Sequence, residues 1–288
     1  MPFCYSPWTN IDISPVGDIS PCCKFQTQHY NKKFNIQSTT ISEYSDSHFL
    51  TKVKKEFLDK QWPKGCERCR IEEENGIESK RILDYTRWKD HYQQQDLSTN
   101  KFITASLAFG NTCNLKCITC SPYSSSQWKK EYQDIYNIDI KHFKFYKQNF
   151  VNDFISSAPN VIHIDISGGE PFLSGTKEQK QLLKHYIDRG HASKVALHYT
   201  TNVTIFPDQE WWEMWSHFQE IDLQFSLDGI DTQCEYIRYP AVWSEIFENI
   251  KKYLEIGKKL NNFRISVSTL SVHITSIILT SLFRGVII

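Results

Sequence analysis

The chain has 288 residues, of which 40% are hydrophobic and 14% aromatic, and this composition excludes an intrinsically disordered protein. Lysine plus arginine and aspartate plus glutamate number 33 each, so the net charge is zero and gives no support to a nucleic-acid partner held by bulk electrostatics. The N-terminus has no basic region followed by an apolar one, and no stretch is apolar for long enough to span a bilayer. We therefore expect a soluble, cytoplasmic protein without a membrane partner.

The first 81 residues differ in pattern from the rest. Thr9–Ser14 and Asp18–Pro21 alternate polar and apolar residues around the turn sequence Pro15-Val16-Gly17, which predicts a β-hairpin ending at two adjacent cysteines. Apolar residues at helical spacing predict a helix over Ser42–Asp59. A turn follows over Trp62–Cys69. We predict a small cysteine-rich hairpin and helix module at 1–81, and a polar, Gln-rich linker at 82–101.

From residue 102 to 288 the pattern alternates between strands and helices. Helices are expected at Lys177–Arg189 and Val242–Lys259. Strands separated by helices imply right-handed crossovers and a parallel sheet, and therefore an α/β domain. The strands are predicted at Phe102–Phe109, Val161–Ser167, Val195–Thr201, Ile221–Leu227 and Phe263–Thr269.

Each predicted strand has one polar face, as in His198, Thr200 and Asn202, although strands buried on both sides are usually apolar throughout. A parallel sheet with helices on one side and a polar inner face fits an open barrel with a wet, ligand-filled lumen. The alternative is an antiparallel sheet with one solvated face, which the intervening helices disfavour.

Nine cysteines occur in tight groups. Cys113, Cys117 and Cys120 directly follow the first predicted strand of the α/β domain. Soft thiolates select iron–sulfur clusters or zinc. Three ligands leave one iron of a cubane free, whereas a closed structural zinc site needs four, so the alternative is a zinc loop completed by a histidine.

This C-x3-C-x2-C spacing resembles the radical SAM superfamily, and so does Gly168-Gly169-Glu170 after the second strand, which looks like that family's GGE motif. The resemblance implies a partial (β/α)6 barrel. It also implies a [4Fe–4S] cluster on the three cysteines that binds S-adenosylmethionine (SAM), with the two glycines at the amino group of the methionine moiety. Adjacent glycines suit such a site because backbone groups can approach a ligand closely.

Three further residues match the family's pattern at the carboxyl ends of strands, where barrel active sites are built. By resemblance, Asn202 and Ser226 contact the ribose or methionine portion of SAM, and Arg238 contacts its carboxylate. Thr119 departs from the pattern, because family members often carry a bulky residue there that packs against adenine.

The N-terminal cysteines resemble the SPASM/twitch auxiliary-cluster module, placed here before the barrel. The implied ligands are Cys4, Cys22, Cys66 and Cys69, with Cys23 as the alternative to Cys22. Four thiolates saturate a cluster, which suits electron transfer or structure, and a four-cysteine zinc site is the alternative. Cys234 has no partner in sequence and is interpreted as a buried thiol.

A full barrel of this family has six strand–helix units, and this chain supplies five. Ser271–Phe283 is expected to form the fifth helix, and Val286–Ile288 the beginning of a sixth strand. We interpret the sequence as a C-terminally short barrel, or as a fragment.

These features predict a radical SAM enzyme. One electron from the reduced cluster would break a carbon–sulfur bond of SAM and give a 5′-deoxyadenosyl radical that abstracts hydrogen from a substrate, with a peptide or protein side chain as the leading class. An electron donor such as flavodoxin or ferredoxin is the expected partner, and the auxiliary cluster would transfer electrons. The alternatives are a non-catalytic zinc- or cluster-bound scaffold and an RNA-modifying radical enzyme, the latter disfavoured by the neutral charge.

Overall fold

A computed structural model of the chain describes residues 2–30, 33–93, 96–137 and 150–269. The chain forms two compact units that interleave along the sequence. The N-terminal unit comprises Met1–Leu107 and Tyr146–Ile164, and the C-terminal unit comprises Ala108–Phe145 and Asp165–Ile288. The helix and strand predicted at Ser271–Phe283 and Val286–Ile288 lie outside the described residues.

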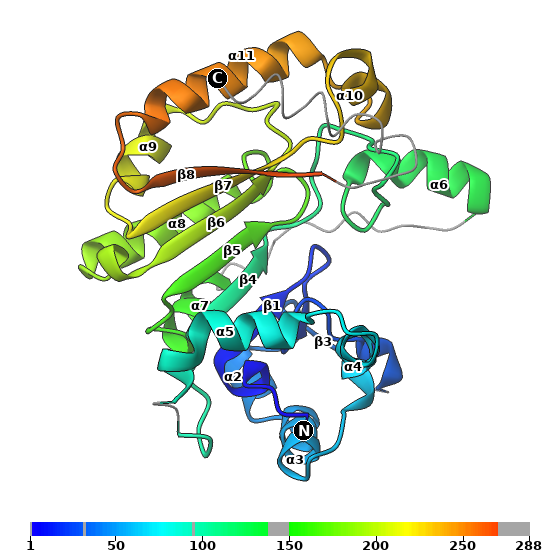
Figure 1. Ribbon diagram of the computed structural model, residues 1–288, viewed down its shortest axis with the longest axis vertical. Coiled ribbons are helices and arrows are strands. Elements are labelled where there is room, and N and C mark those ends of the chain that lie inside the picture. Colours follow the sequence, from blue (N-terminus) through cyan, green and yellow to red (C-terminus); the bar gives the residue numbers. More distant parts are fainter. Residues whose placement is uncertain (1, 31–32, 94–95, 138–149, 270–288) are drawn as a thin grey trace. The chain divides into compact units, whose positions relative to one another are not determined.

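The described strands form a mostly parallel sheet in the order β3-β2-β1-β4-β5-β6-β7-β8, with helices in the intervening segments (Figure 1). This confirms the α/β class; closure into a barrel remains a prediction. The strands are β1 (Asn10–Ile13), β2 (Asp18–Ser20), β3 (Phe34–Asn35), β4 (Thr104–Ala108), β5 (His163–Ser167), β6 (Ala196–Thr201), β7 (Glu220–Ser226) and β8 (Phe263–Ser268).

The helices of the described residues include long elements at the predicted places and short ones between them. They are α1 (Ser6–Thr9), α2 (Ile41–Ser45), α3 (His48–Leu58), α4 (Glu67–Glu74), α5 (Lys80–Tyr92), α6 (Lys129–Tyr136), α7 (Phe150–Ser157), α8 (Thr176–Asp188), α9 (Gln209–Trp215), α10 (Asp231–Ile237) and α11 (Trp243–Gly257). Helix α5 occupies the first part of the range predicted as a linker. No described helix is long and apolar enough to cross a membrane.

The predicted hairpin is confirmed in the N-terminal unit. Strands β1 and β2 pair antiparallel, with Asp12 opposite Ser20, around a turn in which Gly17 has a φ of 82°. β1 also pairs in parallel with β4, with Asn10 opposite Thr104, a contact that the sequence pattern did not indicate.

The helix predicted at Ser42–Asp59 is divided into α2 and α3. The Ser47 side chain accepts a hydrogen bond from the backbone N–H of Leu50, so a new helix begins where the apolar spacing suggested continuity. The first turn of α2 is capped twice: Thr40 and Glu43 form a capping box, and the Asp153 carboxylate of α7 accepts from the N–H of Ile41 at 3.0 Å.

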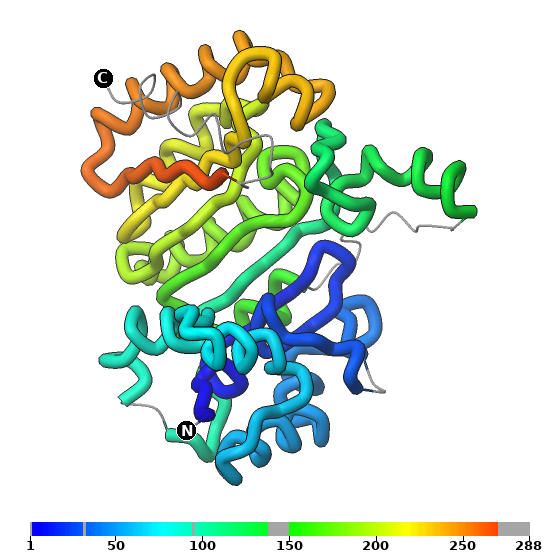
Figure 2. Tube along the Cα trace, turned by 45° about the vertical axis from the view of Figure 1, so that its right-hand side comes forward, coloured from blue at the N-terminus to red at the C-terminus, as the bar shows by residue number. Residues whose placement is uncertain are grey.

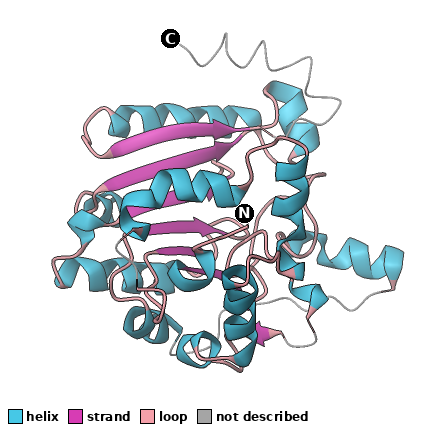
Figure 3. Cartoon of the chain, turned by 60° about the horizontal axis from the view of Figure 1, so that its bottom comes forward, coloured by secondary structure: helices cyan, strands magenta, loops and turns pink. Residues whose placement is uncertain are grey.

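In the C-terminal unit, β6, β7 and β8 run parallel and side by side (Figure 2). Buried and half-buried residues alternate along β6 and β7, which confirms the predicted two-faced strands. The apolar face includes Tyr199 and Leu223, both completely buried. Helix α8 packs against α9, and α11 packs against α10 and β8. Figure 3 shows helices lying beside the strands.

Candidate metal and SAM site

Cys113, Cys117 and Cys120 lie in the loop that follows β4, and this loop is held by its own return segment. The Asn111 amide donates to the carbonyl of Pro122 at 2.8 Å, and the Ser125 hydroxyl donates to the carbonyl of Leu115 at 2.6 Å. The Trp128 indole donates to the carbonyl of Cys117 at 3.0 Å. These three hydrogen bonds hold the cysteine loop against its return segment.

The three thiols are shielded from solvent and close to one another. Cys113 and Cys117 are buried and Cys120 is half-buried. A hydrogen bond from Cys117 lowers the pKa of the Cys120 thiol below its ordinary value, and the same contact raises the pKa of Cys117. Cys117 and Cys120 are thus neighbours in space, as ligands of one centre must be.

Three N–H donors point at the sulfur atoms. The backbone N–H of Leu115 donates to Cys113 Sγ at 3.5 Å, and the Asn202 side chain donates to the same sulfur at 3.8 Å. Arg238 donates to Cys117 Sγ at 3.9 Å. Donors of this kind stabilise thiolates, the form that ligates metal, and they tune the potential of a bound cluster.

The two glycines that follow β5 lie against the backbone of the cysteine loop. The N–H of Gly169 donates to the carbonyl of Gly110 at 3.0 Å, and the N–H of Glu170 donates to that of Thr112 at 2.8 Å. A Cβ added at Gly169 would lie 2.0 Å from the Thr112 oxygen, and Gly168 has a φ of 123°, which disfavours any other residue. Only glycines allow this close approach of the two segments.

Glu170 is completely buried and both of its carboxylate oxygens are engaged. Oε1 accepts from the Thr201 hydroxyl at 2.8 Å, and Oε2 accepts from the backbone N–H of Asn202 at 2.8 Å. Burial raises the pKa of Glu170 to about 7 despite these hydrogen bonds. The carboxylate therefore joins the end of β5 to the end of β6.

Arg238 is nearly buried and forms an ion pair with the completely buried Asp228, with Nη2 to Oδ2 at 2.6 Å. The sequence pattern had singled out Arg238 without this partner. Within the described part of the chain, Nε of Arg238 has no hydrogen-bond partner. Arg238 thus connects Asp228 to Cys117 and keeps one N–H for another acceptor.

The remaining predicted SAM contacts lie at strand ends. Ser226 is the half-buried last residue of β7. Asn202 directly follows β6, and its amide also donates to the Asn114 side chain at 3.0 Å within the cysteine loop. The Asn114 amide in turn donates to Thr204 at 2.8 Å. Sequence patterns did not indicate this amide pair, because it joins residues 88 positions apart.

In the N-terminal unit, four cysteines line one cavity, and they are the set implied by the resemblance to the SPASM module. The other lining residues are two aromatic side chains, one serine and two cations. The full lining is Cys4, Ser6, Cys22, Phe57, Trp62, Cys66, Cys69, Lys80 and Arg81. The donor set and its burial fit an iron–sulfur cluster.

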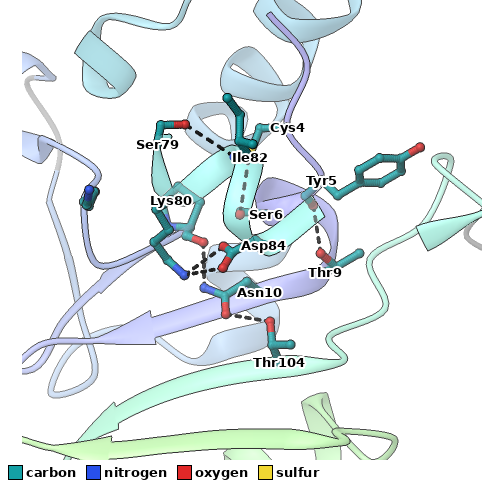
Figure 4. A network of polar contacts seen from close by, with 12 residues as sticks. Cys4, Tyr5, Ser6, Thr9, Asn10, Ser79, Lys80, Ile82, Asp84 and Thr104 are labelled. Carbon is teal, nitrogen blue, oxygen red and sulfur yellow. Dashed lines mark hydrogen bonds and ion pairs between the residues drawn. The ribbon is translucent and has the colours of Figure 1, made fainter. Parts of the chain in front are cut away.

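Cys22, rather than Cys23, lines this cavity, and Cys23 is exposed. The carbonyl groups next to Cys22 are held by side chains of the hairpin. The Asn10 amide donates to the carbonyl of Pro21 at 2.8 Å, and the Ser20 hydroxyl donates to that of Cys22 at 3.0 Å. Asn10 itself accepts from the Thr104 hydroxyl at 2.8 Å (Figure 4).

Cys66 and Cys69 lie at the start of α4, one turn apart. A Cβ added at Gly65 would lie 2.3 Å from the Phe25 ring, and the N–H of Gln26 donates to the carbonyl of Gly65 at 2.9 Å. This contact brings the segment after Cys22 against the start of α4. The pKa of Cys66 is raised, first by burial and then by the neighbouring thiols.

Lys80 and Arg81 were not singled out by the sequence analysis. Burial alone would lower the pKa of Lys80, but Asp84 and the nearby Cys23 and Cys22 thiols together raise it, so the ammonium stays protonated. A partial signal existed in the i, i+4 spacing of Lys80 and Asp84.

Within the described residues, no three thiol, imidazole or carboxylate groups converge closely enough to hold a single metal ion. A cubane does not require such convergence, because each thiolate binds a different iron atom.

Residues 4–70 match the family model described as SPASM, an iron–sulfur cluster-binding domain. The predicted resemblance of the N-terminal segment to this domain is confirmed, and all four cysteines that line the cavity lie inside the matched range. No curated protein sequence matches the chain.

Two solved structures with bound SAM are similar to the chain at low sequence identity. Native anSMEcpe with bound AdoMet is 19% identical over 63% of this chain, with a TM-score of 0.45. SuiB from Streptococcus suis, bound to S-adenosylmethionine, is 15% identical over 94% of this chain, with a TM-score of 0.38. The chain spans only 47% of the length of the first structure and 58% of the second.

Proposed function

We propose that this chain is a radical SAM enzyme that binds a [4Fe–4S] cluster through Cys113, Cys117 and Cys120 and modifies a peptide or protein side chain. The observation that carries the proposal is the placement of three shielded thiols in one braced loop, directly against the glycines and Glu170 that follow β5. Three thiolates leave one position of a cubane open to another ligand. When bound, such a cluster supplies the electron that cleaves SAM reductively.

The residues around the thiols have separate tasks in this proposal. Asn202 and Arg238 donate to the sulfur atoms and stabilise their thiolate form. Nε of Arg238 is buried and has no hydrogen-bond partner in the described structure, which supports its predicted contact with the SAM carboxylate. Gly168 and Gly169 are half-buried beside the cysteine loop, and their backbone groups would contact the methionine amino group. Ser226 would contact the ribose from the end of β7.

The N-terminal unit supplies the auxiliary site. Cys4, Cys22, Cys66 and Cys69 would hold a closed cluster, and closed coordination suits electron transfer rather than substrate binding. Accepting an electron from a substrate radical would make the net reaction an oxidation. The substrate class rests on the resemblance to auxiliary-cluster enzymes, and a flavodoxin or ferredoxin is the proposed donor.

The test is anaerobic reconstitution of the full chain with iron and sulfide, followed by two measurements: iron per chain, and 5′-deoxyadenosine formed from SAM under a strong reductant. We expect about eight irons per chain, since each cubane holds four, together with deoxyadenosine. Cys117→Ala should abolish deoxyadenosine and remove about half of the iron. Cys234→Ala is the matched control, because this buried thiol lies in the same unit but outside the cysteine loop.

Zinc without iron, or iron without SAM cleavage, would contradict the enzymatic proposal and favour the scaffold. A peptide substrate is tested separately, by mass spectrometry of candidate peptides for the loss of a pair of hydrogens. If RNA is modified and no candidate peptide is, the RNA-modifying alternative is favoured.

A further inference from the structure

The cavity of the N-terminal unit presents two positive charges as well as four thiols. Lys80 and Arg81 line it directly, and both belong to the first turn of α5, which begins after the N-cap residue Ser79. The positive end of the helix dipole therefore adds to the two cations at the same place. Figure 4 shows Lys80 and its partner Asp84 close to Cys4 and Ser6.

Each cation is fixed by a carboxylate that is not part of the cavity lining. Lys80 Nζ lies 2.8 Å from Asp84 Oδ2, with both side chains less than a quarter exposed. Arg81 pairs with Glu73, donates to the carbonyl of Phe3 at 2.9 Å, and lies 5.5 Å from the centre of the Trp62 ring. The ion pairs therefore act as oriented dipoles with their positive ends at the cavity.

A cubane on four thiolates is an anion, and its negative charge grows by one when it is reduced. A nearby cation therefore stabilises the reduced form more than the oxidised form. The effect is strengthened where water is excluded, and here Phe57 and Trp62 form part of the wall while Phe57 is only 2% exposed.

We infer that Lys80 and Arg81 are electrostatic partners of the auxiliary cluster that raise its reduction potential and so adapt it to accept an electron. The inference rests on the proposed function in one respect only, that this cavity holds an iron–sulfur cluster. Asp84 and Glu73 orient the cations and partly offset their charge. In each ion pair the cation therefore raises the reduction potential of the cluster and the carboxylate lowers it.

The opposite signs within one ion pair allow a sharp test. The full chain is reconstituted in the Cys117→Ala background, so that only the auxiliary cluster remains, and its midpoint potential is measured by a redox titration followed by electron paramagnetic resonance. We expect Lys80→Met to lower the midpoint potential of the auxiliary cluster. The ratio of reduced to oxidised cluster at a fixed potential should fall about tenfold, which corresponds to a midpoint lower by about 59 mV for one electron. Asp84→Asn should raise the midpoint, because it leaves the ammonium unopposed.

Two further variants separate charge from structure. Lys80→Arg should have a midpoint potential close to that of the wild type, since it keeps the cation. Lys80→Met combined with Asp84→Asn leaves no unpaired buried charge and should lower the midpoint less than Lys80→Met does. Lys55→Met is the matched control, because Lys55 also pairs at i, i+4 in the N-terminal unit but its side chain is 72% exposed.

The possible results are distinguishable. An auxiliary cluster that assembles normally but keeps its midpoint in Lys80→Met and Arg81→Met would overturn the inference and leave the cluster assignment intact. A wild-type N-terminal unit that takes up no iron would overturn the auxiliary site itself and the inference with it. A shift of equal size in Lys55→Met would also overturn the inference, because it would reflect net charge alone.

Discussion

Arg238 and Asp228 form an ion pair in which the two side chains are 8% and 0% exposed. A buried ion pair adds little to folding stability compared with a well-packed pair of apolar side chains. Removing one partner is nevertheless costly, because it leaves an uncompensated buried charge. The structure therefore gives Arg238 a structural task beside the contact with SAM that its sequence position implies. Its second contact, to Cys117 Sγ, means that this task also affects the cysteine loop.

We predict that Arg238→Met lowers the free energy of unfolding by about 3–5 kcal/mol, because it leaves the buried Asp228 side chain without its cationic partner. The measurement is urea unfolding of the chain without metal. Combining Arg238→Met with Asp228→Asn should recover part of the loss. Lys251→Met, which breaks the exposed pair with Glu248, is the control and should change stability by less than about 1 kcal/mol. Equal losses in Arg238→Met and Lys251→Met would contradict the buried-pair argument.

At the scale of elements, strands β6, β7 and β8 present a row of polar side chains on the face opposite the apolar core. His198 Nδ1 lies 3.2 Å from Asp222 Oδ2, and the Ser266 hydroxyl donates to Asp222 Oδ1 at 3.1 Å. The hydrogen bond with His198 lowers the pKa of Asp222, with smaller lowering effects from Ser266 and Arg264. The carboxylate thus cross-links three neighbouring strands.

A lowered pKa in the folded state means that folding favours the ionised carboxylate. The contribution of Asp222 to stability is therefore complete above its unfolded pKa of about 3.9 and is lost as the pH falls through its lower folded pKa. We predict that the urea midpoint of the wild type decreases more steeply below about pH 4 than that of Asp222→Asn. Parallel curves for the two proteins from neutral pH down to about pH 3 would contradict this. Asp188→Asn, at an exposed pair on α8, should follow the wild type.

The elements also show how far local patterns reach. The five predicted strands of the α/β domain agree with β4–β8 to within about two residues at either end, because their alternation is local. The break between α2 and α3 was not predicted, since one serine cap decides it within a continuous apolar period. Likewise, the hydrogen bond from Ile41 to Asp153 joins residues 112 positions apart, beyond any periodicity argument.

At the scale of the whole molecule, the two proposed metal sites belong to different compact units. The four N-terminal cysteines lie within Met1–Leu107, and the cysteine loop lies within Ala108–Phe145. The units interleave because residues 150–164 belong to the N-terminal unit, in which α7 packs against α2. The domain boundaries expected at residues 81 and 102 remain a prediction. That prediction assumes that each domain is one continuous stretch of sequence.

Because the sites lie in separate units, we predict that their iron contents are additive. Cys69→Ala and Cys117→Ala should each keep about four irons per chain, and the double variant should keep almost none. Iron and sulfide analysis after anaerobic reconstitution checks this. Cys23→Ala is the control, because that exposed thiol does not line the cavity. Loss of all iron in either single variant would show that one site cannot assemble without the other.

The sequence by itself determined the α/β pattern, the spacing of Cys113, Cys117 and Cys120, and the SPASM resemblance that the family model confirms. These features depend on residues that are close along the chain, so periodicity and spacing are sufficient to reveal them. Only the tertiary structure decided that Cys22 rather than Cys23 lines the cavity, that Lys80 and Arg81 face it, and that Asp228 holds Arg238. The physical reason is that burial and charge pairing depend on which distant segments pack together, and local spacing does not specify that packing.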